Sequence, residues 1–209
     1  MAVITISREL GSEGDKVADL LCQALGYCRM DKDILLQIAA KAGIDVDALL
    51  ELERGFAKRA RLVSDEMTSL YRKQASAFDK RGAVDDKTYA QILRETLEEL
   101  AQTGDAVIVG RGGQMVLADH PNALHVRLYA PPEARARRLA AREALTEAVA
   151  QQRIEQSDEQ KRQYIRFMFN NADWRNPKHY HLAIDTGRIS PEAAAQIIIL
   201  AARDVDGRR

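Results

Sequence analysis

The first sixteen residues of this chain constrain its fold more than any other segment. A run of strand-forming residues, 3–6, is followed by a turn that contains Gly11 and Gly14. Apolar residues then recur at helical spacing, which predicts an amphipathic helix that begins near Asp15. A strand, a glycine-bearing turn and a helix in this order build phosphate-binding loops, because backbone N–H groups and the positive end of the helix together receive an anion.

The turn does not match the standard spelling of such a loop, G-x-x-x-x-G-K-[ST]. With Gly14 as the second glycine, the first glycine position holds Glu9, the lysine position Asp15 and the Ser/Thr position Lys16. A frame shifted by one residue gives Lys16 the lysine position but puts Leu10 and Asp15 at the glycines. A carboxylate ~4 Å from a phosphate would cost about 4 kcal/mol at an effective dielectric of 20. Asp15 must therefore point outward or engage Mg²⁺.

Predicted strands and amphipathic helices alternate along the rest of the chain, which favours one α/β domain over residues 1–209 with helices on both faces of a parallel sheet. Charged, helical sequence without strand signals predicts a helical excursion over about 45–82. Helical spacing also runs from residue 134 into the 170s, with a weak boundary near 145–146. The further predicted strands are 27–30, 106–109, 124–129 and 182–184.

The overall composition argues against a nucleic-acid or membrane partner. Lysine and arginine together number 31, as do aspartate and glutamate, so the formal net charge is zero. The chain therefore has no excess charge that would attract nucleic acid or a membrane surface. No apolar run approaches the roughly 20 residues of a membrane span, and the N-terminal run lacks the basic flank of a signal peptide. Two cysteines at unpaired spacing indicate a reducing compartment. We expect a cytoplasmic protein with small-molecule partners.

Polar groups follow several of the predicted strands directly. Ligands of open parallel sheets bind beyond the carboxyl ends of the strands, where Arg8, Asp31, Arg111 and Asp185 are expected. Arg111 stands between glycines, and a guanidinium there can grip a phosphate through two parallel N–H bonds. The alternative is a tight turn with a solvated arginine.

The predicted helices over 133–162 carry many charges. Arg138 and Arg142 share one helix face with Arg135, and these arginines either close over a polyphosphate or form a solvated face. Asp158 and Lys161 lie one turn apart, where the carboxylate could read a base edge and the cation take a phosphate, or the two could form a surface ion pair. Trp174 and Tyr180 flank a proline-containing turn and are interpreted as packing residues, and the four histidines show no metal spacing.

Five segments in this order resemble the cytidylate-kinase-like family. They read ITISRELGSEG, YCRMDKDIL, VIVGRGGQMVL, LHVRLYAPPEARARR and DW-x-x-P-x-x-Y-x-L-x-IDT. The resemblance implies a three-layer P-loop NTPase fold with a five-stranded parallel sheet, a helical monophosphate-binding part and an arginine-bearing lid over about 133–162. It also implies ATP with Mg²⁺ as the phosphoryl donor and a pyrimidine nucleoside monophosphate, CMP or dCMP, as the acceptor.

The resemblance also implies roles for individual residues. Arg111 matches an arginine that contacts the acceptor nucleotide, and Asp31 opens a helix near that substrate. Asp158 and Lys161 match an Asp-x-x-Arg pair on the monophosphate. The implied donor-phosphate loop contains Gly11, Ser12, Gly14 and Lys16. The implied cations on the migrating group are Lys16, Arg138, Arg142 and Arg162. Departures from the family pattern are Asp15, Gly112 and the Lys161-Arg162 register.

Three functions fit these observations. The first is a nucleoside monophosphate kinase acting on CMP-like acceptors. The second is a non-catalytic nucleotide-binding or regulatory protein on the same fold, which the altered loop favours. The third is a P-loop kinase for another small acceptor, because the fold alone does not fix the substrate. The metal ligands are unknown, with Ser7 and Ser12 as substitutes for the missing hydroxyl, and a homodimer is left open.

Overall fold

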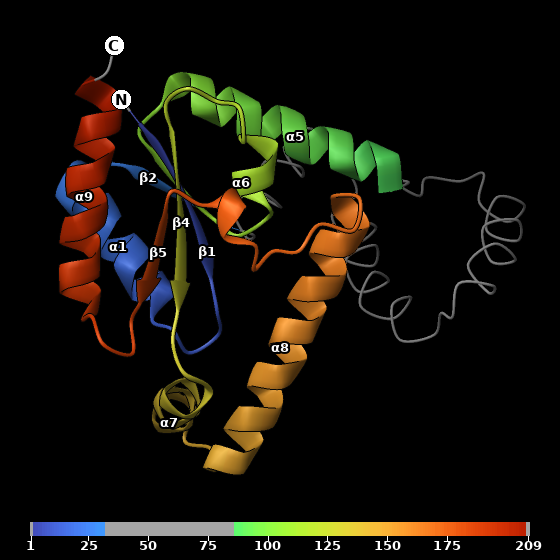
Figure 1. Ribbon diagram of the computed structural model, residues 1–209, viewed down its shortest axis with the longest axis vertical. Coiled ribbons are helices and arrows are strands. Elements are labelled where there is room, and N and C mark those ends of the chain that lie inside the picture. The colour runs from blue at the N-terminus through green and yellow to red at the C-terminus, as the bar shows by residue number, and fades with distance from the viewer. Residues whose placement is uncertain (1, 32–85, 208–209) are drawn as a thin grey trace, which may run out of the picture.

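The computed structural model describes residues 2–31 and 86–207 (Figure 1). The predicted helical excursion over 45–82 and its role lie outside the described residues. Five strands form one sheet in the order β2-β3-β1-β4-β5, and all four neighbouring pairs are parallel. The strands are β1 (Val3–Arg8), β2 (Cys28–Met30), β3 (Ala106–Val109), β4 (Ala123–Tyr129) and β5 (Leu182–Asp185). All five strands expected from the sequence are confirmed.

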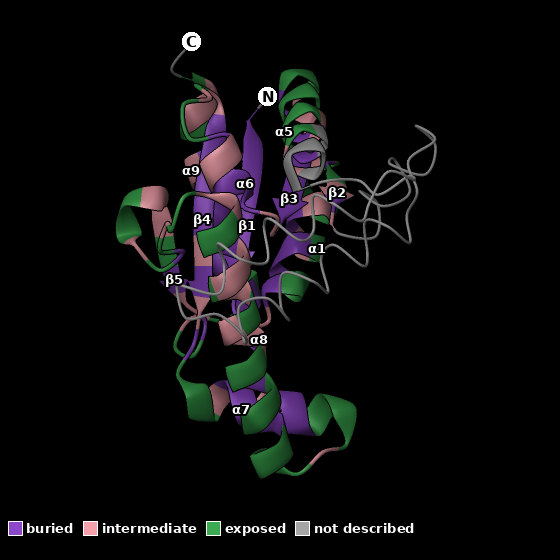
Figure 2. Ribbon diagram, turned by 90° about the vertical axis from the view of Figure 1, so that its right-hand side faces the viewer, coloured by how far each residue is buried: buried purple, intermediate pink, exposed green. Residues whose placement is uncertain are grey.

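Helices cover both faces of this sheet. The helices of the described residues are α1 (Gly14–Leu25), α5 (Asp86–Thr103), α6 (Gly113–Val116), α7 (Pro132–Glu143), α8 (Glu147–Met168) and α9 (Pro191–Gly207), with a short 3₁₀ helix at Pro177–His179. Of these, α7 and the first half of α8 lie beyond one edge of the sheet (Figure 1). Ile4 and Ile6 of β1 belong to one buried cluster with residues of α1 and α9, whereas Val3 packs with α5 on the opposite face. Both faces of the central strands are therefore buried (Figure 2), which is why β1 and β3 read as largely apolar runs. The expected three-layer α/β architecture is confirmed.

The long helical pattern after β4 divides into two helices. Ala144 has a φ of 52° and ends α7, and the hydroxyl of Thr146 accepts a hydrogen bond from the Val149 N–H to cap α8. The weak boundary near 145–146 is therefore real. The expectation of helix into the 170s is wrong, because Asn170 and Asn171 adopt left-handed backbone conformations and α8 stops at Met168. Asparagine tolerates this conformation better than most residues.

The topology places the turn after β1 at the centre of the carboxyl edge of the sheet. β1 lies between β3 and β4, so residues that follow these three strands meet at this edge. Helix α7 and the first half of α8 lie beyond the same edge (Figure 1). Within residues 2–31 and 86–207, no helix has the length and apolar character needed to cross a membrane.

Candidate phosphate-binding site

The turn between β1 and α1 leaves the N-terminus of a twelve-residue helix without a side-chain cap. Glu13 precedes the helix with a φ of 56°, and its carboxylate lies 3.6 Å from Nη2 of Arg138 instead of capping the helix. The Ser12 hydroxyl is buried and donates to the Glu9 carbonyl oxygen over 2.7 Å, while Thr186 donates to the Ser12 carbonyl oxygen over 2.8 Å. These bonds fix the turn. The first N–H groups of a helix have no partner within it, so this end of α1 can receive an anion.

Gly11 allows this turn to lie directly against α7. Its φ is 81°, and a Cβ added there would lie 2.7 Å from the carbonyl oxygen of Arg135. A side chain at position 11 would therefore push α7 away from the turn. Gly11, which the resemblance assigns to the donor-phosphate loop, therefore has a packing role whether or not the loop binds a phosphate.

Lys16 and Asp15 diverge from the centre of the turn. Nζ of Lys16 lies 2.8 Å from Oε1 of Glu192 in the first turn of α9, and this hydrogen bond raises the pKa of the lysine. Both groups are more than half exposed. The role of Lys16 as the loop cation stays a prediction, because the structure joins it to the α1–α9 junction.

The acid in the turn is neutralised by arginines. Oδ1 of Asp15 lies 2.9 Å from Nη2 of Arg29 on β2 and 3.5 Å from Nε of Arg8 at the end of β1. Arg29 also contacts Asp19 and Asp31, at 2.5 Å and 3.2 Å. The two guanidinium groups thus reduce the repulsion expected between the Asp15 carboxylate and a bound phosphate, although Arg29 is shared with two further acids. Asp31 is the last described residue before 32–85, so the helix that it was expected to open lies outside the described residues.

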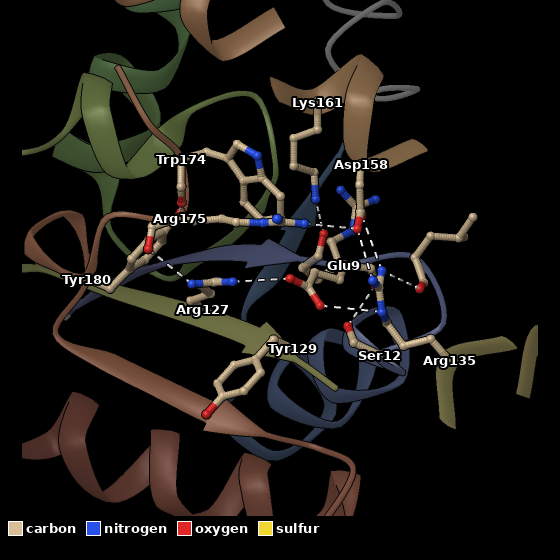
Figure 3. Close-up of polar contacts among 12 residues, drawn as sticks. Glu9, Ser12, Arg127, Tyr129, Arg135, Asp158, Lys161, Trp174, Arg175 and Tyr180 are labelled. Atoms are coloured by element: carbon tan, nitrogen blue, oxygen red, sulfur yellow. Dashed lines mark hydrogen bonds and ion pairs between the residues drawn. The ribbon is translucent and has the colours of Figure 1, made fainter. Parts of the chain in front are cut away.

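A buried ionic network lies beneath the turn (Figure 3). Glu9 is 6% exposed, and its carboxylate lies 3.1 Å from Nη2 of Arg127 and 3.5 Å from Nε of Arg135. Arg135 in turn donates to both carboxylate oxygens of Asp158, at 2.9 Å and 3.2 Å. Arg175 reaches the same carboxylate over 3.1 Å. The network therefore joins β1, β4, α7, α8 and the segment after α8.

Trp174 is the apolar floor of this network. It is 1% exposed, and its ring centre lies 5.3 Å from the guanidinium carbon of Arg127, 4.9 Å from that of Arg175 and 4.7 Å from Nζ of Lys161. Cations over an indole face are attracted by its negative charge distribution. The tyrosine hydroxyl of Tyr180 donates to the Trp174 carbonyl oxygen over 2.5 Å. Interpreting Trp174 only as a packing residue missed this role.

Lys161 connects α8 to the end of β1. Its ammonium donates to the carbonyl oxygen of Arg8, and burial, followed by the charge of Arg8, lowers its pKa to about 7. Lys161 and Asp158, which were expected to share a helix face, both belong to this network. The carboxylate of Asp158, however, accepts its hydrogen bonds from Arg135 and Arg175. The predicted contact of this pair with a monophosphate stays a prediction.

The predicted lid arginines occupy different positions. Arg138 lies next to the turn, where Nη2 donates to the Thr186 carbonyl oxygen over 2.7 Å. Arg142 and Arg162 are about half exposed and pair with Glu143 and Glu159 on their own helices, at 2.8 Å and 2.6 Å. Their roles on a migrating phosphoryl group stay predictions. Only Arg138 of these three contacts the turn in the described structure.

The turn after β3 carries Arg111 towards α8. Gly110, Arg111 and Gly112 all have positive φ, and the guanidinium carbon of Arg111 lies 5.8 Å from the ring centre of Tyr164. A Cβ at Gly112 would lie 2.3 Å from the ring of Phe169 just after α8. The glycines thus hold this turn close to α8.

An open hollow of about 670 Å³ lies beside the network, between α8 and the segment after it. Asp158 and Arg162 are among its lining residues, together with Glu159, Arg166 and Arg175. The hollow has acids and bases in similar number, so it does not by itself select an anion. Among the described residues, no group of three or more histidine, cysteine or acidic side chains is arranged to hold a metal ion.

Sequence reasoning placed Arg8 among the polar groups at the ligand edge of the sheet, but it missed the ionic contacts of Glu9, Arg127 and Arg175. Glu9 carried a usable signal, since it follows β1 directly. Arg127 lies within a strand, and its partner Glu9 is 118 residues away. Arg175 follows Trp174 in a turn that only the fold brings to Asp158. Such contacts depend on the packing of separate segments and leave no local pattern.

The comparisons with known proteins agree with this architecture. The model of the cytidylate kinase-like family matches residues 3–188. An uncharacterized protein from Eubacterium ventriosum ATCC 27560 has a similar structure over 100% of both chains, at 19% identity and a TM-score of 0.68. YorR from Bacillus subtilis, solved in complex with phosphorylated GDP, is similar over 100% of this chain and 99% of its own, at 14% identity and a TM-score of 0.53. At these identities the structures show a shared fold. No curated protein sequence is significantly similar to the chain.

Proposed function

Because the chain belongs to the cytidylate kinase-like family, we propose that it transfers the terminal phosphoryl group of ATP to a pyrimidine nucleoside monophosphate, CMP or dCMP. Family membership and fold support kinase-like phosphoryl transfer. The observation that carries the proposal is the uncapped N-terminus of α1 at the centre of the carboxyl edge of the sheet. Phosphoryl transfer depends on this kind of positioning and charge neutralisation.

Residues from three directions would act on the phosphates. The turn that contains Gly11, Ser12 and Gly14 would hold the donor phosphates through backbone N–H groups. Arg138, already beside Glu13, would reach the donor from α7, and Arg142 and Arg162 would follow on lid closure. Arg111 would hold the acceptor phosphate from the end of β3. Asp31, Asp158 and Lys161 would line the acceptor side.

A magnesium ion fits one carboxylate of the described site. Mg²⁺ prefers oxygen ligands, and the Ser12 hydroxyl is buried against the Glu9 carbonyl oxygen. Asp15 is half exposed, and both arginines that contact it use Oδ1. Asp15 would therefore be the carboxylate that holds the ion. A bound Mg²⁺ would supply positive charge against the phosphates.

The test is ADP release by the full chain with ATP and Mg²⁺ and a panel of acceptors: CMP, dCMP, UMP, AMP and none. We expect the fastest release with CMP or dCMP. We also expect Arg111→Ala to raise the KM for the acceptor, whereas Arg203→Ala, an exposed arginine of α9, leaves it unchanged.

Two other results would redirect the assignment. Release with another acceptor alone would indicate a P-loop kinase of different specificity. A flat panel with a rise in melting temperature on adding ATP would indicate a non-catalytic nucleotide-binding protein. Glu13 and Asp15, two acids in the turn, are the observation that favours this second candidate.

A further inference from the structure

The backbone assigns a different register to the phosphate loop than counting from Gly14 does. The residue that precedes α1 is Glu13, and its φ of 56° lies in the left-handed region that favours glycine. Glu13 therefore occupies the position of the second glycine in G-x-x-x-x-G-K-[ST]. Counting from Glu13, the first glycine position holds Arg8, the lysine position Gly14 and the Ser/Thr position Asp15.

Arg8 and Gly14 are in direct contact in the structure. A Cβ added at Gly14 would lie 2.4 Å from Cβ and 2.7 Å from Cγ of Arg8. Real side chains do not approach so closely, so only one of these two positions can carry a side chain. The standard spelling has the small residue first and the cation at the helix. This chain has the reverse arrangement, with the cation first and glycine at the helix.

The guanidinium of Arg8 lies where a loop cation is needed. Its Nε is 3.5 Å from Oδ1 of Asp15 in the first turn of α1. Its Nη1 is 2.9 Å from the point that a Cβ of Gly110 would occupy, at the end of β3. The side chain thus extends from the β1–α1 turn towards the β3 turn that carries Arg111. It is 31% exposed, so a ligand can reach it.

The backbone of Arg8 is held in place independently of a ligand. Arg8 is in register with Leu128 in the β1–β4 pairing, and its carbonyl oxygen accepts a hydrogen bond from the buried ammonium of Lys161. The backbone of Arg8 therefore needs no further ordering when the side chain binds a phosphate. A guanidinium can also donate two parallel N–H bonds to one phosphate, which an ammonium cannot.

We infer that Arg8 binds the terminal phosphates of the donor nucleotide in place of the usual loop lysine. The glycine at position 14 leaves room for the Arg8 side chain. The inference rests on the proposed function for the identity of the ligand, a polyphosphate chain. It takes the role of loop cation away from Lys16, which is paired with Glu192.

The experiment measures the affinity of the full chain for ATP and for inorganic tripolyphosphate by titration calorimetry, without turnover. Loss of a hydrogen-bonded charge predicts that Arg8→Gln weakens both affinities about ten- to a hundredfold, and that Arg8→Lys recovers part of the loss. Lys16→Gln tests the alternative loop cation and should keep most of the native affinity, because the lysine is paired with Glu192. Arg203→Ala on α9 is the neutral control. Circular dichroism establishes that each variant is folded.

A reciprocal exchange tests the register itself. Gly14→Lys alone should lower the melting temperature, because its Cβ overlaps Arg8. Arg8→Gly combined with Gly14→Lys should relieve the overlap and bind tripolyphosphate more tightly than Arg8→Gly alone. Binding by Arg8→Gln that equals the native affinity, or an equal loss in Lys16→Gln, overturns the inference. If binding depends on Arg8 but no acceptor in the panel is phosphorylated, the proposed function fails and the inference stands. If the native chain binds neither ligand, both fail.

Discussion

Replacing Asp158 by alanine should destabilise the protein far more than replacing its neighbour Glu159. Asp158 is 14% exposed and receives two hydrogen bonds from Arg135, which is 5% exposed, and one from Arg175. Its removal leaves the buried guanidinium of Arg135 with Glu9, 3.5 Å away, as its remaining carboxylate. Breaking one side of a buried ion pair costs about 3–5 kcal/mol.

Glu159 offers a matched comparison on the same helix. It is 43% exposed and pairs with Arg162, which is 55% exposed, so its loss should cost about 1 kcal/mol or less. At roughly 2–4 °C per kcal/mol for a chain of this size, Asp158→Ala should lower Tm by about 6–20 °C, and Glu159→Ala by a few degrees at most. Urea unfolding followed by circular dichroism gives the corresponding free energies.

The reasoning is refuted if the free energies of unfolding of the two variants agree within about 1 kcal/mol. A paired substitution separates charge burial from packing. Arg135→Met with Asp158→Leu removes both charges together and should recover part of the stability lost in Asp158→Ala. A double variant no more stable than Asp158→Ala would show that the loss arises from packing alone.

Two further predictions concern stability. The pKa of Lys161 is about 7 in the folded chain, compared with an ordinary value of 10.5. At and below pH 7 the folded state therefore bears the full cost of the buried charge. This cost falls as the pH rises towards 10.5. Lys161→Met should therefore gain stability over the native chain most at pH 7 and less at pH 9.5, and a pH-independent difference in urea unfolding would contradict this assignment. Gly112→Ala should cost about 1–3 kcal/mol more than Gly26→Ala, because both glycines have a φ near 70° but only a Cβ at Gly112 meets the Phe169 ring. Equal losses of Tm would show that the contact with Phe169 yields.

The sequence predicted the fold well because the fold depends on local patterns. The central strands β1 and β3 are largely apolar runs followed by glycine-bearing turns, and Gly26 ends α1 with a φ of 70° as expected of a glycine after a helix. The turn between α7 and α8 gave only a weak signal, since Ala144 is an unusual residue for a left-handed backbone. The elements that were missed, such as α6, are short.

The candidate site was less predictable, because its contacts join distant segments. Arg135 appeared among residues of a solvated helix face but is buried between Glu9 and Asp158. The register of the loop could not be counted from the glycines, since Glu13 adopts the conformation that a glycine usually supplies. The positive φ of Glu13 shifts the alignment with the standard loop by one residue, so that Gly14 and not Asp15 stands at the lysine position.

Trp174 gives this chain a built-in optical reporter. It is the chain's single tryptophan, so all indole fluorescence originates from the floor of the ionic network. Lys161, which donates to the carbonyl oxygen of Arg8, lies over the same ring. Anion binding that rearranges these cations should therefore change the emission directly. Binding of the proposed nucleotide should thus be detectable in the native chain without a label, next to the lysine that links α8 to the end of β1.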